Sequence, residues 1–339
     1  MTTRARTLGI ALVLTFAMAA SAAAQTLDLR TVEFNSPAVG RTMKYNILLP
    51  RNYTTSTDRY PVLYLLHGLT QNYTVWGLQN SAPFYAGLFD DLIIVMPDGG
   101  NSWYVNWAVN EGGQKNNWED HIIVDVIGHV DRNYRTIARR EGRAMSGLSM
   151  GGYGSITLGL RHPELFISIG TTSGALEHAR QAANRLRNPA QPQQGQGRAQ
   201  TPEERAAAEE QRRRPNPVIG IAGFSSQEER SPLGREFSTP EQGDAYDPFV
   251  LINKIQREQV PHIYIDCGTE DRLIAGAREL ASILMEKNLP FDYMQMAGGH
   301  NATFWTQSIG HITAVQYEVM QRALGRRPVR APAGTATTR

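Results

Sequence analysis

The stretch RAMSGLSMGGYGS, residues 143–155, constrains the fold of this 339-residue chain more than any other. A run typical of a buried strand leads into Ser149, and a helix-like run follows it directly. Gly147, Gly151 and Gly152 surround the serine, and small residues there permit a sharp strand-to-helix turn. Such a turn leaves the hydroxyl free at the carboxyl edge of a sheet. Ser149 is therefore predicted to be a nucleophile; a serine that only caps the helix is the alternative.

Alternating strands and helices surround this turn. Short runs rich in β-branched and aromatic residues predict strands at residues 30–34, 43–50, 61–68, 91–98, 143–149, 166–174, 262–268 and 291–299. The first runs resemble antiparallel strands, and the later, near-continuous apolar runs are typical of parallel strands buried on both faces. Amphipathic patterns predict helices over residues 116–134, with a capping box of Asn116 and Glu119, and within the segment 271–288, where the apolar pattern begins at Leu273. We expect one α/β sheet with helices on both faces.

A serine hydroxyl needs a base, and proteins with this turn place the acid and then the histidine after the serine. Most histidines lie in predicted helices, at strand starts or at the insertion described below: His121, His129, His162, His178, His262 and His311. His67, on a loop, is interpreted as structural. His300 follows a predicted strand and precedes a helix, on the same sheet edge as Ser149. We expect His300 to be the general base.

The acid is expected in the segment YIDCGTEDRLI. Asp266 lies within the predicted strand, whereas Glu270 and Asp271 both lie in the loop that follows it. A carboxylate there would orient the imidazole of His300 and stabilise its charged form. Asp271 is preferred because it stands just before the helix, and Glu270 remains the alternative.

Two backbone amides are predicted to bind the oxyanion of the reaction. One is the N–H of Met150, directly after the nucleophile, and the other is the N–H of Leu69, which follows Gly68 at the end of a strand. The loop after another strand carries Trp103, Tyr104 and Trp107. These aromatic side chains could line a substrate pocket or pack beneath the loop.

Five segments in order resemble the esterase D family of α/β-hydrolases, which includes S-formylglutathione hydrolases, feruloyl esterases and mycolyltransferases. The segments are LLHGLTQNYTVW, PDGGNSWYVNW, GLSMGGYGS, CGTED and GGH, and the resemblance covers residues 28–182 and 244–324. It implies an α/β-hydrolase fold over residues 25–325, with a mostly parallel central sheet, helices on both faces and antiparallel N-terminal strands. It also implies Ser149, Asp271 and His300 as a catalytic triad, with the Leu69 and Met150 amides as the oxyanion hole. Asn301 departs from the Asp or Glu that many relatives carry after the histidine.

The ends of the chain and one internal segment differ from the rest. Residues 1–24 combine arginines, an apolar core and a small-residue end, which predicts a cleavable signal peptide and a periplasmic or secreted protein. Residues 183–243 are rich in Gln, Pro, Arg and Glu and are interpreted as a charged, partly disordered insertion. Residues 326–339 are interpreted as a disordered tail.

Composition and motifs exclude several classes of function. The net charge of +2 gives no reason to expect nucleic acid, no further stretch is apolar enough to span a membrane, and no metal or cofactor motif is visible. We therefore expect a secreted serine esterase acting on feruloyl, acetyl or short-chain acyl esters. An acyltransferase that uses a sugar hydroxyl as acceptor, and a non-catalytic module that binds carbohydrate or the cell envelope, remain as alternatives.

Overall fold

The computed structural model describes residues 27–110, 113–189 and 236–326. The strands are β1 (Asp28–Ser36), β2 (Arg41–Leu49), β3 (Val62–Leu66), β4 (Ile93–Pro97), β5 (Arg143–Leu148), β6 (Ser168–Thr172), β7 (His262–Gly268) and β8 (Phe291–Met296). They form one sheet in the order β1-β2-β4-β3-β5-β6-β7-β8. The pairs β1–β2 and β2–β4 are antiparallel, and every later pair is parallel. All the predicted strands are present, and the mixed α/β architecture is confirmed.

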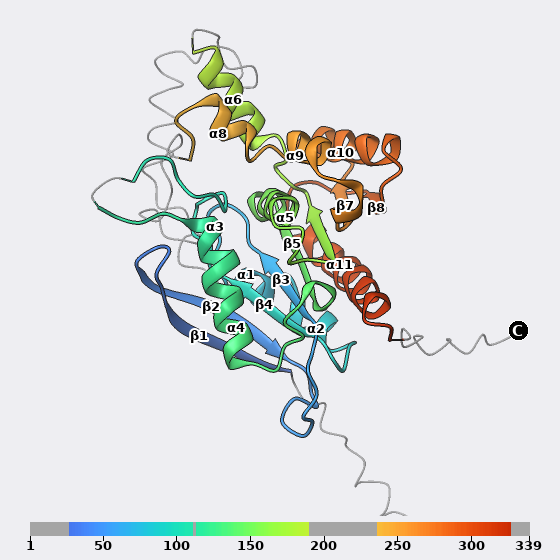
Figure 1. The fold of residues 1–339 in the computed structure, drawn as a ribbon. Coiled ribbons are helices and arrows are strands. Elements are labelled where there is room, and N and C mark those ends of the chain that lie inside the picture. Colours follow the sequence, from blue (N-terminus) through green and yellow to red (C-terminus); the bar gives the residue numbers. More distant parts are fainter. Residues whose placement is uncertain (1–26, 111–112, 190–235, 327–339) are drawn as a thin grey trace, which may run out of the picture.

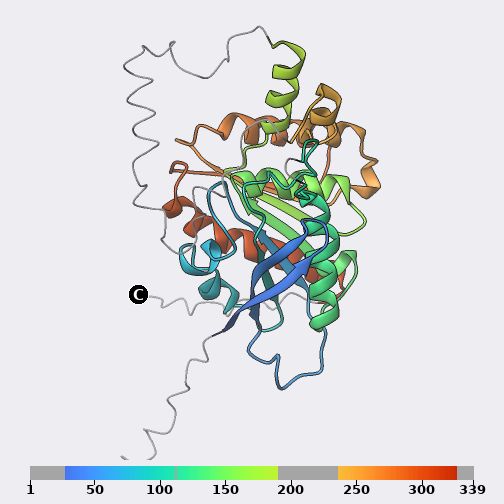
Figure 2. The same cartoon turned by 90° about the vertical axis from the view of Figure 1, so that its left-hand side faces the viewer.

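Helices cover both faces of this sheet. They are α1 (Val75–Leu78), α2 (Ala82–Ala86), α3 (Trp118–Asp120), the π-helix η1 (His121–Val126), α4 (Ile127–Asn133), the 3₁₀-helix η2 (Arg140–Gly142), α5 (Met150–Arg161), α6 (His178–Arg187), α8 (Pro240–Asp244), α9 (Pro248–Lys254), the 3₁₀-helix η3 (Arg257–Gln259), α10 (Ile274–Glu286) and α11 (Ala302–Ala323). The sheet runs between two groups of them (Figures 1 and 2).

Successive side chains along a strand point to opposite faces of the sheet, so a hydrophobic core forms on each face. On β3, Tyr64 and Leu66 join the cluster beneath η1, α4, α5 and α10, whereas Leu63 and Leu65 join the cluster beneath α1, α2 and α11. All four side chains are fully buried. A strand buried on both faces carries a continuous apolar run, which is why these segments could be recognised in the sequence.

One local prediction was wrong. The predicted helix at 116–134 begins at Trp118 and contains a π-helical turn, and its N-cap is Asn117, whose side chain makes no capping bond. Asn116 instead accepts a hydrogen bond from the indole of Trp118, and Glu119 binds Arg161 and His162. A buried ionic partner outside the helix therefore replaces the local capping box.

Several predicted regions fall partly or wholly outside the described residues. These are the signal peptide at residues 1–24, most of the insertion and nearly all of the tail. At the edges of the insertion, residues 183–187 continue α6, and α8 begins with a capping box between Thr239 and Gln242. α6 and α8 lie together, joined by an ion pair between Arg187 and Asp244, and project from the body of the protein (Figure 1).

Candidate active site

Ser149 lies between the last residue of β5 and the first residue of α5. Its backbone has φ 54° and ψ −114°, a region that residues with a side chain rarely adopt. Neighbouring backbone holds it there, because the Ser149 N–H donates to Thr172 O at 3.1 Å and Ser149 O accepts from Ala175 N at 3.0 Å. Strain of this kind persists where the surroundings impose it, and it is concentrated at functional sites.

The glycines around the serine are required by close backbone approach. A Cβ at Gly147 would lie 2.3 Å from the Gly151 carbonyl carbon, and a Cβ at Gly151 would lie 2.4 Å from Leu66 O. A Cβ at Gly152 would lie 2.4 Å from the Thr171 hydroxyl. Any side chain at these positions would push the start of α5 away from the sheet, so the turn depends on all three.

The predicted serine, histidine and acid come together at this edge of the sheet. His300 Nε2 lies 3.0 Å from Ser149 Oγ, and His300 Nδ1 lies 2.9 Å from Asp271 Oδ2. The three residues span more than a hundred positions of sequence, yet their side chains form one continuous hydrogen-bonded chain. The 3.0 Å distance suits transfer of the serine proton to the imidazole, and the 2.9 Å distance suits a hydrogen bond by which the carboxylate orients the ring.

Hydrogen bonds between the loop after β7 and the loop after β8 set the position of Asp271 relative to His300. Thr269 N donates to Met296 O at 2.9 Å, and Glu270 N donates to Gly298 O at 3.0 Å. A Cβ at Gly268 would lie only 2.0 Å from Gly298 O, so the loops touch directly. In this arrangement Asp271 is buried, and the side chain of Glu270 is exposed.

The surroundings of Asp271 favour its charged form. Burial by itself raises the pKa of this carboxyl, but hydrogen bonds from the His300 ring and from the Leu273 N–H outweigh it and hold the pKa below its ordinary value. The Trp305 ring meets the imidazole of His300 edge-on, with ring centres 5.1 Å apart. The acid therefore stays ionised and the imidazole keeps one orientation.

The loop that carries Leu69 lies against the nucleophile. A Cβ at Gly68 would lie 3.4 Å from the Ser149 Cβ. Around this turn Gly68 N donates to Gln71 Oε1 at 2.7 Å, Thr70 N to Asn101 Oδ1 at 2.6 Å, and Gln71 N to Gly68 O at 3.2 Å. The Leu69 N–H has no acceptor within the described residues, so this turn leaves it available to a ligand.

The second predicted donor is the first amide of a helix. Met150 is buried and opens α5, where an amide has no carbonyl one turn earlier in the helix to bond. The start of a helix also carries partial positive charge, which favours an anion.

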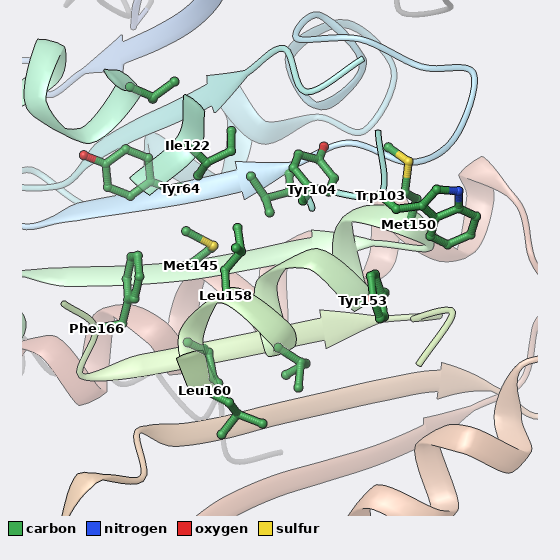
Figure 3. Packing of buried hydrophobic residues seen from close by; sticks show 14 of the residues in the cluster. Tyr64, Trp103, Tyr104, Ile122, Met145, Met150, Tyr153, Leu158, Leu160 and Phe166 are labelled. Atoms are coloured by element: carbon green, nitrogen blue, oxygen red, sulfur yellow. The ribbon is translucent and has the colours of Figure 1, made fainter. Parts of the chain in front are cut away.

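The loop that carries Trp103, Tyr104 and Trp107, here called the aromatic loop, lies near the start of α5. Figure 3 shows Trp103, Met150 and Tyr153 near one another at one end of the buried cluster. Trp103 stacks on His178, with ring centres 3.4 Å apart and planes within 4° of parallel, and meets Tyr153 edge-on at 5.9 Å. Trp107 is half-buried and donates to Ser102 O at 3.0 Å.

Tyr104 packs beneath this loop. It is fully buried, and its hydroxyl donates to His67 O at 2.9 Å. Its ring fills the space that side chains at Gly99 and Gly154 would occupy. The sequence pattern places His178 at the insertion and does not single out Tyr153. Tyr153 stands one helical turn after Ser149, and that spacing is the signal that could have found it.

Within residues 27–110, 113–189 and 236–326, no cluster of His, Cys, Asp and Glu could hold a metal ion. Among those residues, no helix is both apolar and long enough for a membrane crossing.

Known proteins resemble this chain in sequence over different lengths. An esterase of Mycobacterium tuberculosis is 38% identical over 144 residues, which is 42% of this chain and 31% of that protein, so the match spans under a third of the relative. The diacylglycerol acyltransferase/mycolyltransferase Ag85A of Mycobacterium leprae is 25% identical over 296 residues, covering 82% of this chain and 76% of that protein.

Solved structures resemble it in fold. The crystal structure of S-formylglutathione hydrolase from Staphylococcus aureus superimposes with a TM-score of 0.59, covering 86% of this chain and 99% of that one at 22% identity. This similarity confirms the predicted α/β-hydrolase fold. A family model described as "Putative esterase" matches residues 36–314, most of the chain. The chain therefore belongs to this esterase family.

Proposed function

We propose that this protein is a secreted serine esterase that hydrolyses carboxylic esters through an acyl-enzyme. The observation that carries the proposal is the hydrogen-bonded chain from Asp271 through His300 to Ser149, with distances of 2.9 and 3.0 Å. Membership of the esterase family supports it. Export rests on the sequence pattern of residues 1–24.

Acylation follows from this geometry. The Ser149 oxygen attacks the ester carbonyl while His300 Nε2 accepts the serine proton. Asp271 accepts the Nδ1–H bond and stabilises the imidazolium that forms. The Leu69 and Met150 amides are assigned to the oxyanion of the tetrahedral intermediate. Its collapse breaks the bond to the alcohol oxygen, and the proton on Nε2 passes to the departing alcohol.

Deacylation repeats these steps with water. His300 takes a proton from water, the hydroxide formed attacks the acyl-serine, and the same amides bind the second oxyanion. The bond to Ser149 Oγ breaks, the serine regains the proton, and a carboxylic acid leaves. We assign feruloyl, acetyl or short-chain acyl esters as substrates and Trp103 and Trp107 as candidates for substrate contact.

Removing the nucleophile tests the proposal. Ser149→Ala should lower kcat for p-nitrophenyl acetate by at least about 10³-fold, because the acyl-enzyme cannot form. Circular dichroism should be unchanged. The matched control is Ser282→Ala, which removes an exposed serine on α10 and should keep full turnover. Undiminished turnover in Ser149→Ala would refute the serine mechanism, and absence of turnover in the wild type across an ester panel would favour a binding module.

An acyltransferase is the second candidate. Its chemistry differs only in deacylation, where a sugar hydroxyl replaces water. The similarity to a mycolyltransferase over 82% of this chain favours keeping it. Product analysis in the presence of a sugar acceptor separates the two, since a transferase yields the acylated sugar and a hydrolase the free acid.

A further inference from the structure

His67 lies directly after β3 and is fully buried, although sequence reasoning gave it no chemical role. Its ring makes two hydrogen bonds. The Gly99 N–H donates to Nε2 at 2.9 Å, and Nδ1 lies 2.8 Å from Gly68 O. Because Nε2 accepts, the neutral ring carries its proton on Nδ1 and donates it to the Gly68 carbonyl. The Asp98 carboxylate lies 3.4 Å from the same Nε2.

The Gly68 carbonyl belongs to the same peptide unit as the Leu69 N–H. A trans peptide is planar, so its C=O and N–H point in opposite directions. A bond that pins the carbonyl oxygen toward His67 therefore aims the Leu69 N–H away from His67. The Gln71 N–H holds the same oxygen at 3.2 Å, and Gly68 lies against Ser149.

We propose that His67 is the positioning residue of the oxyanion hole, because its Nδ1–H fixes the rotation of the Gly68–Leu69 peptide. The inference deepens the proposed esterase function and rests on it. His67 acts through the peptide and does not touch substrate.

Tyr104, in the aromatic loop, also holds His67 in place. The Tyr104 hydroxyl donates to His67 O at 2.9 Å, so the carbonyl of this residue is held as well as its ring. Tyr104 has a left-handed backbone, with φ 57°, and its ring fills the space left by Gly99 and Gly154. This arrangement explains why Tyr104 is buried on a loop beside the active site: it locks the oxyanion turn.

Two substitutions of His67, to Asn and to Gln, distinguish the roles of its two ring nitrogens. An Asn side chain places an N–H donor near the position of Nδ1, whereas a Gln side chain places its amide near Nε2. Loss of one oxyanion donor costs about 10²–10³ in kcat. His67→Gln should therefore lower kcat for p-nitrophenyl acetate by about 10²-fold with KM changed less than about threefold, whereas His67→Asn should stay within about tenfold of wild type.

A second measurement reports the oxyanion hole itself. A phenylboronic acid forms a tetrahedral adduct with a catalytic serine, and its affinity should fall in His67→Gln by the same factor as kcat/KM. Thermal unfolding of both variants controls for stability. Tyr104→Phe provides an independent test, since it removes one hydrogen bond to His67 and should lower kcat several-fold with KM unchanged.

Equal losses of kcat in His67→Asn and His67→Gln would overturn the role of His67. So would an unchanged affinity of His67→Gln for the phenylboronic acid. If His67→Gln does not fold, unchanged kcat in Tyr104→Phe would overturn it. Ser149→Ala is assayed alongside. Turnover that persists in Ser149→Ala contradicts the esterase mechanism itself, so the two failures are distinguishable.

Discussion

Asp271 differs from Glu270 in burial. Asp271 is 2% exposed and bonds His300 at 2.9 Å, whereas the neighbouring carboxylate faces solvent. Sequence alone left both candidates open, because either could reach the loop from the end of β7. The choice depends on hydrogen bonds between the loops at 269–271 and 296–300, and no local pattern encodes those.

Substituting each acid tests this difference. Asp271→Asn should lower kcat by about 10³–10⁴-fold, because the imidazole loses its orienting charge and its tautomer is no longer fixed. Glu270→Gln is the matched control and should keep turnover within about threefold of wild type. Steady-state kinetics at pH 7.5 measure both. A larger loss of kcat in Glu270→Gln than in Asp271→Asn would show that Glu270, and not Asp271, is the acid that orients His300.

Other residues of the site could be predicted because their signals are local. Ser149 stands in a glycine-rich turn that any strand-to-helix elbow of this kind requires, and His300 lies in the loop that follows a recognisable strand. His67 was missed because a buried loop histidine has no distinguishing pattern. Its role depends on which ring nitrogen meets which carbonyl, and that information exists only in three dimensions.

At the scale of elements, Glu119 joins three parts of the chain. It lies in α3, is buried, and accepts bonds from Arg161 and His162 at the end of α5 and from Tyr246 beside α8. Burial alone raises the pKa of Glu119, but these bonds outweigh it and lower the pKa to about 2. Glu119 therefore bonds to these distant residues and does not form the predicted capping box within its own helix.

The lowered pKa predicts a pH dependence of stability. A carboxyl with a depressed folded pKa contributes fully above its unfolded pKa, about 4.5, and the contribution is lost as pH falls toward 2. Glu119→Gln should therefore reduce the free energy of unfolding by about 3 kcal/mol at pH 7, and the difference from wild type should shrink below pH 4.5.

Urea unfolding at several pH values measures this difference. Glu279→Gln is the control, because Glu279 pairs with Arg180 in a half-exposed position and its loss should cost under about 1 kcal/mol at every pH. A Glu119→Gln difference that is the same at pH 7 and pH 3 would contradict the account.

At the scale of the whole molecule, all eight strands were predicted but their order was not. Apolar runs mark buried strands, whereas the placement of β4 between β2 and β3 depends on contacts between distant segments. The resemblance to a family supplied the α/β-hydrolase topology that periodicity could not. The Gln- and Arg-rich insertion lies mostly outside the described residues, so its partly disordered character stays a prediction.

The convergence of Ser149, His300 and Asp271 is the central claim, and covalent labelling tests it most directly. With diisopropyl fluorophosphate, the Ser149 oxygen should displace fluoride and gain one diisopropylphosphoryl group, which peptide mass spectrometry locates. We predict a single adduct on the peptide containing Ser149, none in Ser149→Ala, and much slower formation in His300→Ala. An adduct on a different residue, or labelling at an unchanged rate without His300, would contradict it.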